Sequence, residues 1–286
     1  MKNFKILSYS RRQDAPSSTK HMQHLLDGFK QGFIEKVGST QVIPTKNVKF
    51  IVFWSKYPSA LEQVTKQIPV PFYLLYTITG HGKIHEPNVP YVQKQIELFI
   101  SLSKKIGKNS VIWRFDPVII DKNLPVNKVI EQFKFIGEQI HPYTNKVVFS
   151  FVDTSYLSGN KAQNGYKYQK ISQTEQNDFL TQMLKITSGW NLPVYSCAEG
   201  LSFPQVLKNK CIDNDLISQI TGESVPYEKD KAQTREHCQC HKSTDVGSYA
   251  SNCAFQCGYC YGNYFRSMDA NRKNQQRAKL NFLNSL

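Results

Sequence analysis

The chain alternates between short apolar runs and amphipathic stretches, and this alternation constrains its fold more than any other feature. The apolar runs are nearly continuous, without the polar alternation of a half-exposed strand, so they predict strands buried on both faces of a parallel sheet. These strands are expected at residues 5–10, 50–55, 72–79, 111–116, 146–153 and 194–199, with a weaker one at 244–249. Helices are expected at residues 18–36, 90–106, 125–140 and 174–187. The repetition predicts an α/β fold, namely a TIM-like or partial (β/α) barrel.

The length and composition indicate one domain. With 286 residues and 40% hydrophobic content, the chain can bury a large core, and no linker separates a second unit. We expect a single (β/α) barrel domain over 1–286, in which 230–265 form a cysteine-rich, cluster-binding segment and 266–286 a C-terminal helix. No apolar stretch approaches the roughly 18 residues of a membrane span, and the N-terminus lacks the apolar region of a signal peptide. A cytoplasmic location without a membrane partner is therefore expected.

Polar side chains end or follow several of the expected strands. In a parallel barrel the C-terminal ends of all strands share one rim, so these groups are expected to surround one cavity. Helix capping and turn chemistry are the alternative explanation for each of them. His81 and His85, near a glycine-containing turn, are expected in a solvated loop. The candidate catalytic or substrate-binding residues are Arg11, Arg12, Asp14, Lys56, Arg114, Asp116, Asp153 and Glu199.

Three cysteines near the C-terminus, Cys253, Cys257 and Cys260, are spaced C-x3-C-x2-C. Thiolates of one tight loop can approach a single metal cluster together, and soft sulfur ligands suit iron–sulfur clusters or zinc. A cubane cluster held by three thiolates keeps one iron open to a small molecule. The alternative is a zinc site completed by a remote residue such as Cys240 or His241.

The other four cysteines are Cys197, Cys211, Cys238 and Cys240. Cysteines that cluster in a chain from a reducing compartment indicate metal binding rather than a disulfide framework. Four thiols are the number that completes a tetrahedral zinc site or an auxiliary [4Fe-4S] cluster, and we favour iron–sulfur over zinc. Alternatively, they are buried cysteines that behave as small hydrophobic residues.

The first three cysteines, with Tyr259 before the last, resemble the C-x3-C-x-aromatic-C loop of radical S-adenosylmethionine enzymes. The resemblance implies that Cys253, Cys257 and Cys260 bind a [4Fe-4S] cluster whose open iron takes S-adenosylmethionine, with Tyr259 against its adenine. It also implies an electron donor such as a flavodoxin or ferredoxin. In most such enzymes this loop follows the first strand, whereas here it follows the last expected one. A circularly permuted radical-SAM barrel would account for that position.

The whole chain also resembles an uncharacterised bacterial family, the DUF1848 proteins. Departures from the family's pattern, at Gln13 and Gln239, remove no expected ligand. The family's C-terminal cysteines are described as similar to the radical-SAM cluster, but the resemblance implies no particular reaction. The matching stretches are SYSRRQDAP at 8–16, FWSKYP at 53–58, TITGHG at 77–82, WRFDP at 113–117, SFVD at 150–153, CAE at 197–199, KCID at 210–213, KDKAQTREHCQC at 229–240, DVGSY at 245–249 and CAFQCGYCYGNYF at 253–265.

Three functions remain open at this point. The leading hypothesis is a radical S-adenosylmethionine enzyme that generates a 5′-deoxyadenosyl radical, which acts on an unknown small-molecule or macromolecular substrate. The second is a non-enzymatic zinc or iron–sulfur protein that binds nucleic acid, because 36 Lys and Arg against 22 Asp and Glu give a net charge of +14. The third is a barrel hydrolase with Asp14, Asp116 and Asp153 as acid–base candidates.

Overall fold

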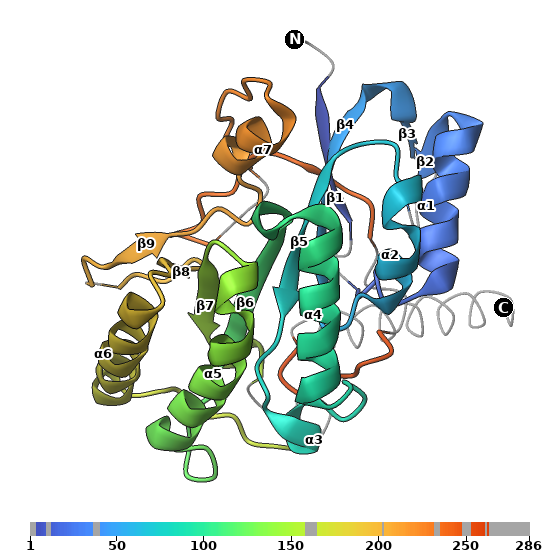
Figure 1. Cartoon of the computed structure of the whole chain (residues 1–286). Coiled ribbons are helices and arrows are strands. Elements are labelled where there is room, and N and C mark those ends of the chain that lie inside the picture. Colours follow the sequence, from blue (N-terminus) through green and yellow to red (C-terminus); the bar gives the residue numbers. More distant parts are fainter. Residues whose placement is uncertain are drawn as a thin grey trace, which may run out of the picture.

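A parallel β-sheet forms the centre of the protein in a computed structural model (Figure 1), which describes residues 4–9, 13–36, 41–157, 165–201, 203–231, 235–247, 253–260 and 262. Within these residues the sheet has eight strands in the order β10-β1-β4-β5-β6-β7-β8-β9, and every neighbouring pair is parallel. The strands are β1 Lys5–Tyr9, β4 Val48–Ser55, β5 Phe72–Thr77, β6 Val111–Val118, β7 Val147–Phe151, β8 Val194–Ser196, β9 Val206–Lys208 and β10 Thr244–Asp245. The predicted α/β class and parallel sheet are confirmed.

Helices occupy the connections between the strands, as the alternation of patterns predicts. A small antiparallel hairpin, β2 Phe33–Glu35 with β3 Val42–Pro44, follows the first helix. The α-helices are α1 Thr19–Gln31, α2 Ser59–Val64, α3 Gly82–His85, α4 Val92–Ile106, α5 Val126–Ile140, α6 Gln173–Gly189 and α7 Asn214–Thr221. Short 3-10 turns lie at η1 Thr45–Asn47, η2 Thr65–Gln67, η3 Lys108–Ser110, η4 His141–Tyr143 and η5 Thr154–Tyr156.

The two faces of the sheet are covered by different parts of the chain. Helices α1, α2, α4, α5 and α6 contribute to the larger apolar cluster, which includes Leu25, Phe99, Phe133 and Phe179. Helix α7 contributes Ile217 to a second cluster on the opposite face. Strands β9 and β10 are at opposite edges of the sheet. Residues 209–243, which connect them, therefore cross the face that the five helices leave uncovered, and we call them the crossover.

Several details of the sequence prediction differ from the structure, and the short helices α2, α3 and α7 and the β2–β3 hairpin were not expected. The first expected helix ends at Gln31 rather than Lys36, because Gly32 adopts a left-handed conformation (φ 87°) and the chain continues as β2. Strand β9, with its largely exposed side chains, was not expected. The predicted helix at 266–286 lies outside the described residues.

The sheet is open in the described part of the chain, since no ladder joins its edge strands β9 and β10. A closed TIM-like barrel is therefore not confirmed. No helix among the described residues has the length and apolar character needed to cross a bilayer.

Candidate functional site

Residues 253–260, which follow β10 and which we call the cysteine loop, lie against the segment that follows β5. The Gly258 amide donates a hydrogen bond to the His85 carbonyl (2.9 Å), and the Asn88 side chain donates one to the Ala254 carbonyl (2.8 Å). The loop also closes on itself through a bond from the Cys260 amide to the Cys257 carbonyl (3.1 Å). Its apolar surroundings are Val89, Phe255 and Tyr57, together with the three cysteines and Tyr259.

The three thiols of this loop lie close enough to affect one another's protonation. Burial raises the pKa of the Cys257 thiol, the Lys56 charge opposes this, and charge on Cys260 or Cys253 raises it further. Burial also raises the pKa of Cys253, and a hydrogen bond from the Asp14 backbone opposes that shift. Without a cation Cys253 and Cys257 therefore keep their protons, whereas a bound metal replaces protons on sulfur. The three cysteines thus share one small loop in which Cys257 is buried and Cys253 and Cys260 are half-buried.

Tyr259 points its phenol into a buried polar cluster. Its hydroxyl donates to Glu86 Oε1 (2.5 Å), the same oxygen that accepts hydrogen bonds from Lys56 Nζ (2.5 Å) and Thr79 Oγ1 (2.7 Å). The Lys56 ammonium also lies 5.2 Å from the centre of the Tyr259 ring. Glu86 thus connects the aromatic residue of the cysteine loop to the C-terminal ends of β4 and β5.

The pKa values of Glu86 and His81 in this cluster are both strongly shifted. Burial alone would raise the pKa of Glu86, but Lys56, His81 and the hydrogen bonds from Lys56 and Tyr259 lower it to about 2. Burial lowers the pKa of His81 to about 4. At neutral pH the cluster therefore holds an ionised carboxylate and an uncharged imidazole.

The sequence analysis missed Glu86 and misplaced its neighbours. His81 and His85 were expected in a solvated loop, yet they are 5% and 2% exposed, so that prediction is wrong. The adjacent turn brings them under the cysteine loop, which is about 170 positions further along the chain. A local pattern such as GHGKIHEP at 80–87 does not indicate that a loop so distant in the sequence covers these side chains.

The candidate residues at the strand ends form three groups rather than one ring. Asp14 is half-buried beside β4, where it accepts hydrogen bonds from Ser55 Oγ (2.7 Å) and the Lys56 amide (2.6 Å). Burial raises the pKa of Asp14 to about 6 against these bonds and the Lys56 charge. Because Lys56 binds Glu86, which also accepts the Tyr259 hydrogen bond, this group lies next to the cysteine loop. Arg11 and Arg12 lie outside the described residues.

The second group lies on β6, on the face opposite the main helices. Arg114 pairs with Asp116 and also contacts Thr77 Oγ1 (3.3 Å), while Asp116 accepts a hydrogen bond from Ser150 Oγ (2.8 Å). Ile112, two residues before Arg114, belongs to the second core cluster, so side-chain alternation places Arg114 and Asp116 on that same face. These groups are only partly exposed, at 17% and 11%.

The third group lies towards the other edge of the sheet. Asp153 pairs with Arg235 (3.4 Å), and Glu199 Oε1 accepts a hydrogen bond from the Phe151 amide (3.0 Å). Burial raises the pKa of Glu199, although the Phe151 bond and the Arg235 charge oppose this. The contact with Arg235 links the strand ends to the crossover.

The other four cysteines also come together, on the face covered by the crossover. Cys197 Sγ lies 3.3 Å from Cys211 Sγ, and the Cys211 amide donates to Cys240 Sγ (3.3 Å). Cys238 packs against the same apolar cluster. All seven cysteines lie in the described residues, and none forms a disulfide. Within the described residues, however, no three Cys, His, Asp or Glu side chains already converge as the ligands of one bound ion.

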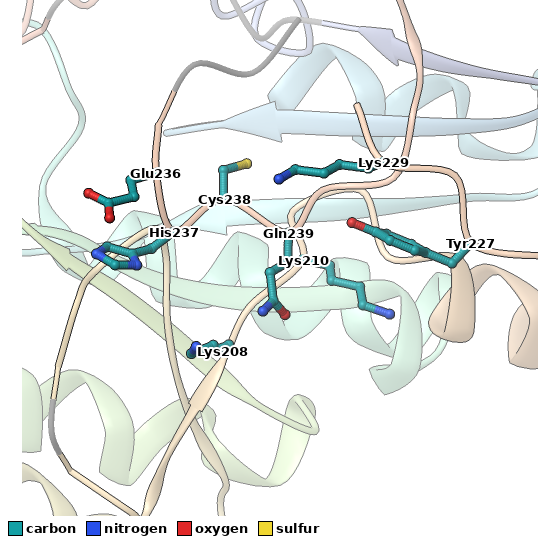
Figure 2. Close-up of a pocket in the computed structure, with 8 residues that line it drawn as sticks. All are labelled: Lys208, Lys210, Tyr227, Lys229, Glu236, His237, Cys238 and Gln239. Atoms are coloured by element: carbon teal, nitrogen blue, oxygen red, sulfur yellow. The ribbon is translucent and has the colours of Figure 1, made fainter. Parts of the chain in front are cut away.

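A basic pocket opens beside Cys238 (Figure 2). Its volume is about 380 Å³, and three lysines line it against a single acidic residue. Lys210 is partly neutralised by Asp215 (2.7 Å). The lining residues are Lys208, Lys210, Tyr227, Lys229, Glu236, His237, Cys238 and Gln239.

Comparison with known proteins yields one match. A family model described as Domain of unknown function (DUF1848) matches residues 6–262, a range that includes the cysteine loop and, apart from Lys5 of β1, all eight strands of the described sheet. No curated protein matches the chain, and no solved structure does either.

Proposed function

Because this chain belongs to the DUF1848 family, whose description assigns no reaction, we propose from its own residues that it is a radical S-adenosylmethionine enzyme. The observation that carries the proposal is the loop of Cys253, Cys257 and Cys260, which gathers three thiols under an apolar cover beside Lys56. The protein would work in the cytoplasm, where thiols stay reduced, with a flavodoxin or ferredoxin as electron donor.

The donor set fits a [4Fe-4S] cluster. In a cubane each thiolate binds a different iron, so the three sulfurs need not converge on one point as the ligands of a single ion do. The apolar contacts of Val89 and Phe255 would shield the cluster, and Lys56 would offset part of its negative charge. When bound, the cluster and S-adenosylmethionine would supply an electron and a 5′-deoxyadenosyl radical.

The position of β10 supports a circularly permuted, partial (β/α) barrel. This last strand pairs in parallel with β1, with Leu7 opposite Thr244, and so precedes β1 in the spatial order of the sheet. The chain therefore continues from β10 towards the cysteine loop on the side of the sheet where the C-terminal ends of β1, β4 and β5 lie. A loop that follows a first strand would lie there too, and open parallel sheets bind ligands at the C-terminal ends of their strands.

The chain's own residues would divide the remaining work. Tyr259 would position the adenine, and its bond to Glu86 would fix the ring relative to β4 and β5. Arg114, Asp116 and Ser150 would face the substrate on the side of the sheet away from the main helices. A cationic Arg114 suits an anionic substrate group.

The test is S-adenosylmethionine cleavage by the full chain. After anaerobic reconstitution with iron and sulfide and reduction with dithionite, we expect 5′-deoxyadenosine, quantified by liquid chromatography and mass spectrometry. Cys257→Ala removes a ligand, so product should fall to background. Ser188→Ala, on the exposed end of α6, should behave as wild type. A reconstituted wild type that makes no product, or a Cys257→Ala variant that still makes it, contradicts the proposal.

A metal-containing protein that binds nucleic acid is the second candidate. The lysines of the pocket in Figure 2 and the net charge of +14 favour it. It predicts that affinity for nucleic acid falls steeply as salt rises, because phosphate contacts release counterions. It also predicts no cleavage of S-adenosylmethionine, so the experiment above separates the two candidates.

A further inference from the structure

We propose that Cys197, Cys211, Cys238 and Cys240 bind one tetrahedral metal ion of the zinc type, which attaches the crossover to the sheet. The four residues come from three separate segments: Cys197 directly follows β8, Cys211 precedes α7, and the other two precede β10. This centre is distinct from the cysteine loop, and the argument for it does not depend on the proposed enzymatic function.

Contacts between the segments already hold the four thiols in one place. The Cys197 amide donates to the Phe149 carbonyl (2.8 Å), which fixes Cys197 at the end of β8 beside β7. The Cys211 amide donates to Cys240 Sγ, and the His241 amide donates to the Ile212 carbonyl (2.9 Å). Cys240 in turn shares hydrogen bonds with the thiols of both Cys211 and Cys238. The four thiols therefore form one chain of contacts, from Cys197 through Cys211 and Cys240 to Cys238.

The spacing of the sulfurs favours one ion over a cluster. Thiolates at about 2.3 Å from a tetrahedral zinc lie about 3.8 Å from one another. Cys197 Sγ and Cys211 Sγ are 3.3 Å apart, which is already close to that sulfur–sulfur distance. Thiolates of a cubane bind separate irons and lie further apart. This contact therefore shifts the preference from the auxiliary [4Fe-4S] cluster expected from sequence to a single ion.

The surroundings suit four thiolates on a divalent cation. Asn209 Nδ2 donates to Cys211 Sγ (3.4 Å), and the Cys211 amide donates to Cys240 Sγ, so two sulfurs receive the N–H bonds that stabilise metal-bound thiolates. The cationic side chains of Arg114 and Arg235 lie near enough to Cys197 to interact with charge on it. They would offset the net negative charge of the centre. Cys238 faces the pocket of Figure 2, which gives the ion a path from solvent.

The centre would provide stability that the crossover otherwise lacks. Among the described residues of the crossover, 209–231 and 235–243, the buried apolar side chains apart from cysteine are Ile212, Ile217 and Val225. The crossover nevertheless leads directly into β10, whose two residues pair with β1. A metal bound to both β8 and the crossover would therefore also hold β10, and with it the start of the cysteine loop.

Metal content tests this inference in the full chain. By inductively coupled plasma mass spectrometry, purified wild type should contain about one zinc per chain. The double variant Cys211→Ser/Cys240→Ser should lose that zinc, and Cys257→Ala should retain it. As a measurement that needs no variant, cobalt(II) exchanged into wild type should give the intense thiolate-to-cobalt absorption of a tetrahedral, sulfur-rich site.

Several results would overturn the inference. They are wild type without stoichiometric zinc, a double variant that keeps it, zinc lost from Cys257→Ala, or cobalt without thiolate absorption. About four irons per chain that disappear in the double variant would show an auxiliary cubane instead. Failure of the proposed function is seen separately, because S-adenosylmethionine cleavage depends on Cys257 and zinc content does not.

Discussion

Glu86 is kept ionised in a nearly dry environment by groups from three parts of the chain. Lys56 comes from the end of β4, Thr79 follows β5, and Tyr259 comes from the cysteine loop. Burying a charge costs free energy unless partners and hydrogen bonds replace water. Here they do more than offset burial, since the pKa of Glu86 falls to about 2. Glu86 therefore ties the cysteine loop to the sheet more strongly when it is charged than when it is protonated.

This argument predicts a pH-dependent cost for Glu86→Gln. A carboxyl whose pKa falls from 4.5 to about 2 on folding stabilises the protein above pH 4.5, and this contribution disappears as the pH falls towards 2. At pH 7 we expect the variant to lose on the order of 2–3 kcal/mol of unfolding free energy, measured by urea denaturation of metal-free protein. The difference from wild type should shrink below pH 4.5. Glu131→Gln, at an exposed position on α5, is the control. A loss that is equal at pH 7 and pH 3 would contradict the argument.

For individual residues, the sequence could identify those whose role depends on their spacing from near neighbours in the chain. The cysteines of the loop are four and three positions apart, so they must lie together in any compact turn. Burial lowers the pKa of His81, whereas Lys56, His81 and the bond from Tyr259 lower that of Glu86 against burial, and no local pattern reveals either shift. Asp14 was a candidate because it follows a strand, but its contact with Ser55 depends on how β1 and β4 pair.

Among the elements, α5 and α6 show how closely two helices approach where a side chain is missing. A Cβ added to Gly137 of α5 would overlap the ring of Trp190, the residue that ends α6, and would lie 3.1 Å from Trp113. The Trp113 ring is completely buried and stacks on Phe133. The neighbours of Gly137 are therefore aromatic rings that cannot move without disturbing the core.

We expect Gly137→Ala to be destabilising even though alanine favours helices. Its gain of about 1 kcal/mol in helix propensity is smaller than the 1–3 kcal/mol that overpacking typically costs. Gly189→Ala is a matched control, because a Cβ added at that residue of α6 meets no atom within 4 Å. It should be neutral or slightly stabilising. Urea unfolding of the two variants checks this, and equal stability would show that Trp190 can move aside.

Element boundaries illustrate what periodicity can and cannot predict. Long buried strands such as β4 and β6 stand out as continuous apolar runs, so they were found near their true limits. Strand β9 is three residues long and its side chains are largely exposed, so its two apolar residues, Val206 and Leu207, make too short a run to mark a strand. The helix at 18–36 was extended too far because the apolar pair Phe33 and Ile34 continues its pattern beyond Gly32, into a hairpin.

For the whole molecule, the sequence predicted a parallel sheet buried on both faces, whereas the closed TIM-like barrel expected as one form of it is not confirmed. Runs buried on both sides require a parallel sheet with cover on each face, and that is what the chain forms. Whether the edge strands meet depends on the twist and stagger of the whole sheet, which no single run encodes. The gathering of four cysteines likewise depends on the crossover passing back beneath β8. Count and residue type could suggest a second centre, but only the topology brings its ligands together.

The middle of the sheet and the crossover are expected to differ in local stability. Strands β4, β5, β6 and β7 lie in the middle of the sheet and have large side chains on both faces. The crossover rests on a few apolar residues and leads to a two-residue edge strand. Segments with few buried contacts open locally long before the whole protein unfolds. The metal centre proposed above would be needed most in this part.

Amide hydrogen exchange measured by mass spectrometry should therefore respond to zinc in one region. In both metal-free and zinc-loaded wild type we expect the slowest exchange in β4 to β7. Zinc should slow exchange in the crossover and β10 by at least about tenfold, because an ion that binds only the closed state lowers the population of open forms. The Cys211→Ser/Cys240→Ser variant should show no such slowing at the same zinc concentration. Slowing spread evenly over the sheet, or equal slowing in that variant, would mean that zinc acts elsewhere and that the crossover is held by its apolar contacts alone.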